Sequence, residues 1–209
     1  MIDRIWLVRH ASTDWSGKRW CGRTDLPLSA EGIAEAEELA IWLAARLPPD
    51  VVVVSSPARR ARDTAEPIER LLHLRTNVGG GRGGVDVDAG LREVDFGRAE
   101  GWTWPEIERG LPRLAAALAA GASNVDWPAG ETADAVSRRV EAAWQRLAER
   151  DRPVVAVCHG GVIRALLAGL GLDGDKTSSI APAATLELHR VGRAWTVAPA
   201  AERGMVRER

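Results

Sequence analysis

The chain has 209 residues, which is enough for one domain with a sizeable hydrophobic core. Its 28 basic residues nearly balance its 29 acidic ones, and the formal net charge of −1 gives no reason to expect nucleic acid or a membrane surface as a partner. No apolar run approaches the length of a membrane span, and the N-terminus is too charged for a signal peptide. We expect a soluble cytoplasmic protein, a monomer or a homodimer, with residues 1–200 as a single domain and residues 201–209 as a frayed polar tail.

Short apolar runs rich in β-branched residues predict strands that are covered on both faces, as in a parallel sheet. Three such runs each end abruptly in polar residues: Ile5–Val8, Val51–Val54 and Val154–Cys158. Near the C-terminus, Thr185–His189 and Trp195–Val197 predict an antiparallel hairpin.

Helical patterns separate the predicted strands. They cover Ser29–Leu47, Ser56–Leu74, Glu131–Arg150 and Gly161–Leu170, and in the first two the leading serine is a candidate N-cap. The alternation of strands and helices favours an α/β fold, a three-layer α/β/α sandwich with a mostly parallel central sheet and one antiparallel edge strand. The glycine-rich stretch at residues 78–84 follows a helix rather than a strand, so it predicts a surface loop and not a dinucleotide site.

Side chains with useful chemistry follow the predicted strands. Ligands of open α/β sheets bind beyond the carboxyl ends of the strands, so we expect these side chains to meet at one edge. A glutamate in a further loop can join them. The set comprises Arg9 and His10, one of Arg59, Arg60 and Arg62, then Glu93, and finally His159 with Gly160.

This set of residue types suits a phosphate dianion. Arginine presents a planar fork to phosphate oxygens and stays charged. A neutral imidazole is a nucleophile near pH 7, and a second imidazole, protonated beside the phosphate, can donate to oxygens that gain charge. A carboxylic acid can protonate the leaving oxygen. We therefore expect a phosphohistidine on one of the two histidines, and neither a metal nor another cofactor, because arginine and imidazolium already supply positive charge.

A cysteine-dependent phosphatase is an alternative. Cys158 and Arg164 are separated by five residues between a predicted strand and a predicted helix, which is similar to the phosphate loop of cysteine-dependent tyrosine phosphatases. Against it, Val162 and Ile163 would crowd such a loop, and the residues at the other strand ends would have no role. Cys158 is then a small buried strand residue.

Five ordered sequence blocks resemble the histidine phosphatase superfamily, in its phosphoglycerate mutase-like branch. Together they cover most of the chain. The blocks are Leu7–Thr13, Gly22–Ser29 with Gly32, Ser55–Ala65, Leu91–Gly97 with Glu100 and Gly101, and Val157–Arg164.

The resemblance assigns roles to individual residues. It implies that His10 is the phosphorylated nucleophile, Glu93 the acid and His159 the second histidine. It implies that Arg9 and Arg60 hold the phosphate. It further implies phosphate contacts from Ser16, Gly22 and Gly160.

The chain departs from the family pattern at three positions, none of which removes a catalytic group. Ala11 stands where glycine is usual after the first histidine, Ser16 stands where asparagine is frequent, and Asp63 stands where glutamine is common. Ser16 can still donate to phosphate, although its side chain is shorter.

The resemblance implies a phosphomonoester hydrolase that acts on a small phosphorylated metabolite. Asp95–Gly97 and the compact length are similar to the phosphatase members, in which water attacks the phosphohistidine. The same residues would also suit a mutase with the same chemistry, or a non-catalytic phosphate-binding module. Trp15, Trp20, Trp102 and Trp104 flank the expected site and form either a wall for the organic part of the substrate or ordinary core.

Overall fold

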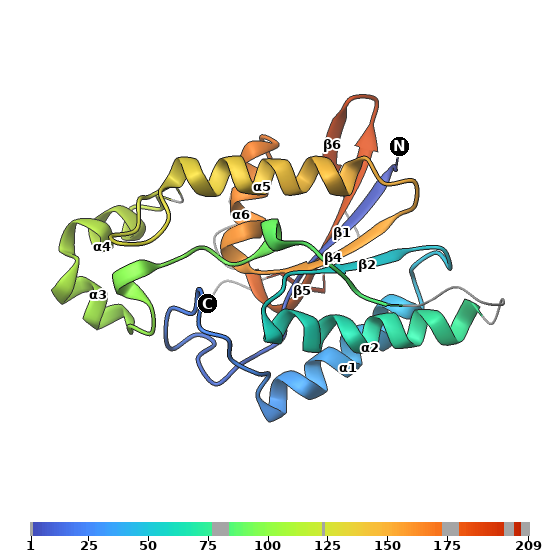
Figure 1. The fold of residues 1–209 in the computed structure, drawn as a ribbon, viewed down its shortest axis with the longest axis horizontal. Coiled ribbons are helices and arrows are strands. Elements are labelled where there is room, and N and C mark those ends of the chain that lie inside the picture. Colours follow the sequence, from blue (N-terminus) through green and yellow to red (C-terminus); the bar gives the residue numbers. More distant parts are fainter. Residues whose placement is uncertain (1, 77–83, 123, 173–179, 199–202, 206–209) are drawn as a thin grey trace.

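The structure, a computed structural model, describes residues 2–76, 84–122, 124–172, 180–198 and 203–205. Its centre is a seven-stranded sheet in the order β3-β2-β4-β1-β5-β6, with β7 paired to β5 (Figure 1). The strands are β1 (Arg4–Arg9), β2 (Val52–Ser55), β3 (Asp86–Val87), β4 (Val154–Cys158), β5 (Ile180–Val191), β6 (Ala194–Val197) and β7 (Arg203–Met205).

The sheet is mostly parallel, as predicted. Strands β3, β2, β4 and β1 run parallel, β5 pairs antiparallel with β1, and β6 and β7 pair antiparallel with β5. The predicted hairpin is the β5–β6 pair. The antiparallel part at this edge therefore contains more than one strand.

Helices cover both faces of the sheet. In Figure 1, α1 and α2 lie on one side and α5 and α6 on the other, while α3 and α4 lie beyond one end. The helices are α1 (Ala30–Ala44), α2 (Arg59–Thr76), α3 (Trp104–Gly110), α4 (Pro112–Ala119), α5 (Ala133–Ala148) and α6 (Gly160–Gly169), with two 3₁₀ turns, η1 (Ala89–Leu91) and η2 (Gly97–Ala99).

The core is divided between the two faces because successive strand residues point in opposite directions. In β1, Ile5 and Leu7 pack in the cluster that includes the buried residues of α5 and α6. Trp6 and Val8 pack in the cluster beneath α1 and α2. The four central residues of β1 are all buried, which explains why the sequence run shows no polar alternation.

One local prediction differs from the structure. Helix α2 begins at Arg59 rather than at Ser56, because the N–H of Ser56 continues the sheet ladder by donating to the carbonyl of Val157 at 2.9 Å. Near the C-terminus, Arg203–Met205 form β7, which pairs with β5.

Two further points concern regions named in the sequence. Ser29 is the N-cap of α1, as predicted, and accepts a hydrogen bond from the N–H of Gly32 at 3.1 Å. The glycine-rich loop at residues 78–84 lies, apart from Gly84, outside the described residues. Among the helices that the structure describes, none combines the length and apolarity needed to cross a bilayer.

Candidate active site

The carboxyl ends of β1, β2 and β4 bring the expected site residues together. The ladder extends past the strands, since the N–H of His10 donates to the carbonyl of Cys158 at 2.9 Å. This register places His10 and His159 side by side, with ring centroids 5.1 Å apart in an edge-to-face arrangement. The predicted meeting of strand ends is therefore present in the fold.

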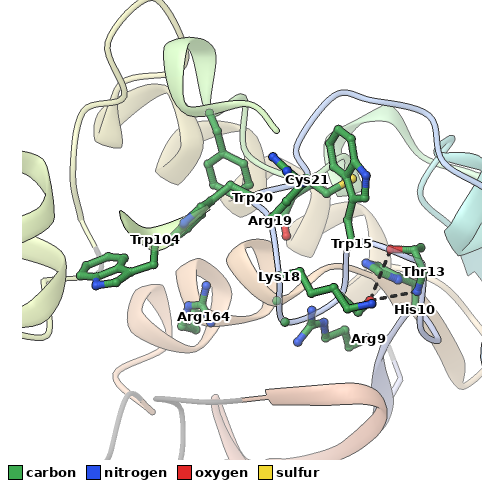
Figure 2. Close-up of a pocket in the computed structure, with 15 residues that line it drawn as sticks. Arg9, His10, Thr13, Trp15, Lys18, Arg19, Trp20, Cys21, Trp104 and Arg164 are labelled. Atoms are coloured by element: carbon green, nitrogen blue, oxygen red, sulfur yellow. Dashed lines mark hydrogen bonds between the residues drawn. The ribbon is translucent and has the colours of Figure 1, made fainter. Parts of the chain in front are cut away.

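A cavity of about 350 Å³ opens at this edge (Figure 2). The expected residues that line it are Arg9, His10, Ser16, Glu93 and Gly160. The other lining residues are Thr13, Trp15, Gly17, Lys18, Arg19, Trp20, Cys21, Phe96, Trp104 and Arg164. Arg60, His159 and Gly22 are not among the lining residues.

The hydrogen bonds of His10 define its tautomer. Nδ1 lies 2.7 Å from the carbonyl oxygen of Ala11, which can only accept, so Nδ1 carries the proton. Nε2 is then unprotonated, and its lone pair accepts a hydrogen bond from Nε of Arg60 at 3.3 Å. The nucleophilic atom that this arrangement offers is Nε2.

Arg60 is almost completely buried, with 1% of its surface exposed. Its terminal nitrogens donate to the carbonyls of Thr24 at 2.9 Å, Gly22 at 2.9 Å and Cys21 at 3.3 Å. The loop at residues 21–24 therefore holds the guanidinium beside His10. Arg59 and Arg62 are exposed, so Arg60 is the arginine of this helix that reaches the site.

His159 is fully buried, and its Nε2 lies 2.8 Å from the hydroxyl of Ser56. Its Nδ1 has no hydrogen-bond partner among the described residues. Ser56 follows β2, so the ends of two adjacent strands fix the orientation of this ring. Gly160 follows His159 and begins α6, and the positive N-terminal end of that helix adds to the positive potential of the cavity.

Both histidines are held neutral in the folded protein. Burial lowers the pKa of His10 well below its ordinary value, and the charges of Arg60 and Arg9 lower it further. The pKa of His159 is also well below its ordinary value, through burial first and then through Arg60, His10 and Arg9. A phosphate dianion would oppose these effects, because negative charge favours the protonated imidazole.

Arg9 ends β1 and is half-buried. One terminal nitrogen donates to the carbonyl of Ile180, whereas Nε has no acceptor within the described part of the chain. Burial lowers the pKa of Arg9, but an arginine remains charged near neutral pH. Its unused N–H donor is available for an oxyanion in the cavity.

Glu93 is 8% exposed and lies in the loop after η1. Its carboxylate accepts hydrogen bonds from the N–H of Val94 at 2.9 Å and the N–H of Gly161 at 3.2 Å. A Cβ at position 161 would lie 2.4 Å from Oε1 of Glu93, so glycine is required for this close approach. The start of α6 thus fixes the carboxyl group.

The remaining expected phosphate contacts differ in position. Ser16 lines the cavity, and its hydroxyl accepts from the N–H of Thr13 at 2.9 Å. Gly22 does not face the cavity, because its N–H donates to Glu100 and its carbonyl accepts from Arg60. Three of the four tryptophans, Trp15, Trp20 and Trp104, line the cavity, whereas Trp102 packs against the core.

Several residues have a place at the site that the sequence patterns do not assign to them. Thr64 joins two elements, since its hydroxyl accepts from the N–H of Ala11 at 3.0 Å and donates to the carbonyl of Arg60 at 2.7 Å. Ser56 has only a capping role in the sequence pattern. Lys18 and Arg164 add positive charge to the cavity lining. The position of Ser56 at a strand end is the one sequence signal among these residues that points to the site.

The cysteine-dependent alternative is wrong. Cys158 is 0% exposed within β4 and does not line the cavity. Burial raises the pKa of its thiol far above the ordinary value, so the reactive thiolate is suppressed. Cys158 belongs to the core beneath α5 and α6.

The family model of the histidine phosphatase superfamily (branch 1) matches residues 5–200. The chain belongs to this family. The histidine phosphatase is 38% identical over 178 residues to glucosyl-3-phosphoglycerate phosphatase of Mycobacterium tuberculosis, an alignment that covers 80% of this chain and 74% of that protein. It is 32% identical over 172 residues to the uncharacterized phosphatase PhoE of Bacillus subtilis, covering 79% and 76% of the two chains.

Solved structures agree with this assignment. The mycobacterial glucosyl-3-phosphoglycerate phosphatase in complex with VO3 matches this histidine phosphatase with a TM-score of 0.76 and 30% identity, covering 94% of this chain and 97% of that one. Phosphoglycerate mutase of Thermus thermophilus matches with a TM-score of 0.67 and 33% identity, covering 93% and 96%. The predicted family and the phosphoglycerate mutase-like fold are confirmed. The histidine phosphatase is a phosphoric monoester hydrolase that uses phosphohistidine chemistry.

We predict that acidification destabilises the fold through the two buried histidines. Their folded-state pKa values lie below those of the unfolded chain, so the stability gained from keeping them neutral is complete above about pH 6.5. It is lost as the pH falls toward the folded-state values, by at most about 1.4 kcal/mol per pH unit for each histidine. The free energy of unfolding in urea, measured from neutral to mildly acidic pH, should fall more steeply in the wild type than in His10→Asn. Equal slopes would contradict the buried neutral state of His10.

Proposed function

We propose that the enzyme hydrolyses small phosphomonoesters through a phosphohistidine on Nε2 of His10, without a metal ion. The observation that carries this proposal is the hydrogen-bonded tautomer of His10. Nδ1–H is committed to the carbonyl of Ala11, so Nε2 keeps a lone pair at the cavity. The lowered pKa of His10 keeps that lone pair unprotonated near neutral pH.

In the first step, Nε2 of His10 attacks phosphorus, and the bond from phosphorus to the leaving oxygen breaks. Protonated Glu93 gives its proton to that oxygen, which releases an alcohol. Arg9 binds the phosphoryl oxygens through its unused Nε–H, and Arg60 adds positive charge beside the forming bond. The carbonyl of Ala11 stabilises the positive charge that the ring gains at Nδ1–H.

In the second step, water attacks the phosphohistidine, and the bond from Nε2 to phosphorus breaks. The Glu93 carboxylate takes a proton from the water, and inorganic phosphate leaves. His159, protonated once the dianion offsets its cationic neighbours, donates to a phosphoryl oxygen. Ser16 and Gly160 are further phosphate contacts in this proposal, whereas Gly22 acts through its contact with Arg60. We propose metal independence because two arginines and a protonated His159 supply the charge.

The mutase alternative differs only in what attacks the phosphohistidine, a second hydroxyl or water. The phosphatase names of the relatives at 38% and 32% identity favour water. The non-catalytic alternative is disfavoured by the complete set of nucleophile, acid and cationic groups. Burying two neutral histidines beside arginines costs stability, and simple phosphate binding would not require it.

The cavity favours a substrate with a second acidic group. In Figure 2, Arg9, Lys18 and Arg164 lie along the lower side of the cavity. The lining contains one carboxylate, that of Glu93. The ion pairs of the described residues do not include Lys18 or Arg164, so both charges can bind substrate. Glucosyl-3-phosphoglycerate, named for the mycobacterial relative, carries a carboxylate besides its phosphate.

Trapping of the intermediate tests the proposed function. The enzyme is mixed with a phosphomonoester in excess EDTA, quenched rapidly and analysed by mass spectrometry. We expect one phosphoryl group on His10, labile in acid and stable in alkali, with free phosphate as the product. Cys158→Ser serves as the control and should retain the label. A His10→Ala enzyme that keeps full activity would refute the nucleophile, loss of labelling in EDTA would refute metal independence, and an isomerised product would identify a mutase.

We predict that Glu93→Gln slows alkyl phosphates more than aryl phosphates. A phenolate leaves without a proton, whereas an alkoxide needs one, so loss of the acid should cost about 10²- to 10⁴-fold for alkyl substrates only. The measurement is kcat/KM for a glycerol phosphate and for p-nitrophenyl phosphate, because kcat/KM reports the steps up to release of the leaving group and not the later attack of water, in which Glu93 serves both substrates as the base. Equal losses for both substrates would remove Glu93 from the acid role.

We predict that Lys18→Met weakens binding of a carboxylated phosphomonoester. The KM for 3-phosphoglycerate should rise about fivefold to tenfold, which corresponds to roughly 1 kcal/mol, while KM for p-nitrophenyl phosphate stays unchanged. Arg138→Met is the matched control, because Arg138 is exposed on α5 and its loss changes the net charge equally. A uniform rise for both substrates would show that Lys18 does not recognise the second acidic group.

A further inference from the structure

Glu100 lies just after η2 and outside the lining of the cavity, yet it organises a loop of the site. Its carboxylate accepts hydrogen bonds from three successive backbone N–H groups. These are the N–H of Gly22 at 3.0 and 3.1 Å to the two oxygens, of Arg23 at 3.2 Å and of Thr24 at 3.0 Å. Consecutive N–H groups that converge in this way form a concave anion site, and here a side chain of the same protein occupies it.

The opposite side of the same loop faces Arg60. The carbonyls of Cys21, Gly22 and Thr24 accept from the Arg60 guanidinium, which in turn donates to Nε2 of His10. The loop peptides therefore lie between a carboxylate and a guanidinium. Each charge polarises the peptide groups in the sense that strengthens the hydrogen bonds of the other.

We propose that Glu100 is a positioning residue for phosphoryl transfer, which holds the 21–24 loop so that its carbonyls fix the Arg60 guanidinium against His10. This inference rests on the proposed role of His10 as nucleophile. Glu100 does not touch the reacting atoms. It acts on His10 indirectly. Its carboxylate binds the N–H groups of the 21–24 loop, and the carbonyls of that loop bind Arg60.

Two observations support a dedicated role over ordinary loop anchoring. Among the described residues Glu100 forms no ion pair, and its hydrogen bonds come from backbone N–H groups. At position 22 a Cβ would lie 2.3 Å from the carbonyl oxygen of Val94 and 2.8 Å from Oε2 of Glu100. Glycine at this position is thus required for the loop to approach the carboxylate.

Loss of Glu100 should act on His10 through Arg60. The charged and titratable groups that face His10 are Arg9 on its own strand, Arg60 from α2 and His159 after β4. Of the charges that lower the pKa of His10, Arg60 has the largest effect. A displaced guanidinium would let this pKa rise and would remove stabilisation from the transition state.

Glu100→Gln tests the proposal, because it keeps the size of the side chain and removes its charge. With p-nitrophenyl phosphate we expect kcat to fall about 10- to 100-fold, as for a misplaced catalytic group, with little change in KM. An NMR titration of the four histidines should show the pKa of His10 moved upward. Glu100→Asp keeps the charge on a shorter side chain, so its kcat and its His10 pKa should lie between those of the wild type and of Glu100→Gln. If Glu100→Gln does not fold, a wild-type kcat and a wild-type His10 pKa in Glu100→Asp would overturn the proposal.

Asp88→Asn is the matched control. Asp88 accepts from the N–H of Gly90 at 2.7 Å and pairs with Arg146, but it does not contact the 21–24 loop. It should lower the unfolding temperature without changing kcat of the folded enzyme or the pKa of His10. The proposal is overturned if Glu100→Gln leaves kcat unchanged, or if its loss of rate follows the loss of folded protein while the pKa of His10 stays constant. A wild type that never forms phosphohistidine, with the pKa shift still present, would refute the proposed function, although Glu100 would still be shown to hold Arg60 against His10.

Discussion

The Nε–H of Arg60 donates to Nε2 of His10, and both side chains are almost fully buried, at 1% and 6% exposure. A buried guanidinium is unfavourable unless its donors are satisfied and its charge is offset. Here three loop carbonyls satisfy the donors, and the carboxylate of Glu100 offsets the charge from the far side of the loop. The order of strands β2, β4 and β1 brings α2 and the end of β1 together for this purpose. Burial of these charged groups therefore costs free energy, which packing on both faces of the sheet must offset.

The same constraint explains why two imidazoles can lie edge to face beside two arginines. Neither ring can be charged at low cost in this environment, and both pKa values lie below the ordinary range. The site therefore combines neutral nucleophilic nitrogen with fixed positive charge, the combination that a phosphate dianion needs. In the proposed reaction, binding of the dianion raises the pKa of His159, since a nearby negative charge favours the imidazolium. In the proposed reaction this proton arrives at His159 only when a phosphoryl group is present to receive its hydrogen bond.

Much of the fold and of the site could be predicted because continuous stretches of the sequence indicate them. The buried runs of β1, β2 and β4 are continuous in the sequence, and the polar residues after each run lie at one sheet edge by geometry alone. Other features depend on contacts distant in sequence. The local pattern makes Ser56 a helix cap, but its N–H remains in the ladder and its hydroxyl contacts His159. The family resemblance assigns Gly22 to phosphate, and the hydrogen bond from its N–H to Glu100, which lies 78 residues further along the chain, has no signal in the local pattern.

The hydrogen bond between Arg60 and His10 also bears on how the transfer step begins. In the proposed reaction the lone pair that accepts from Arg60 is the one that attacks phosphorus, so this hydrogen bond has to break as the new bond forms. At 3.3 Å it is already long, and a guanidinium held by three carbonyls cannot follow the ring. Its N–H is then left beside the phosphoryl oxygens, where charge develops in the transition state. A displaced Arg60 would leave the phosphoryl oxygens without this charge, which is a physical reason for the three loop carbonyls that hold the guanidinium behind His10.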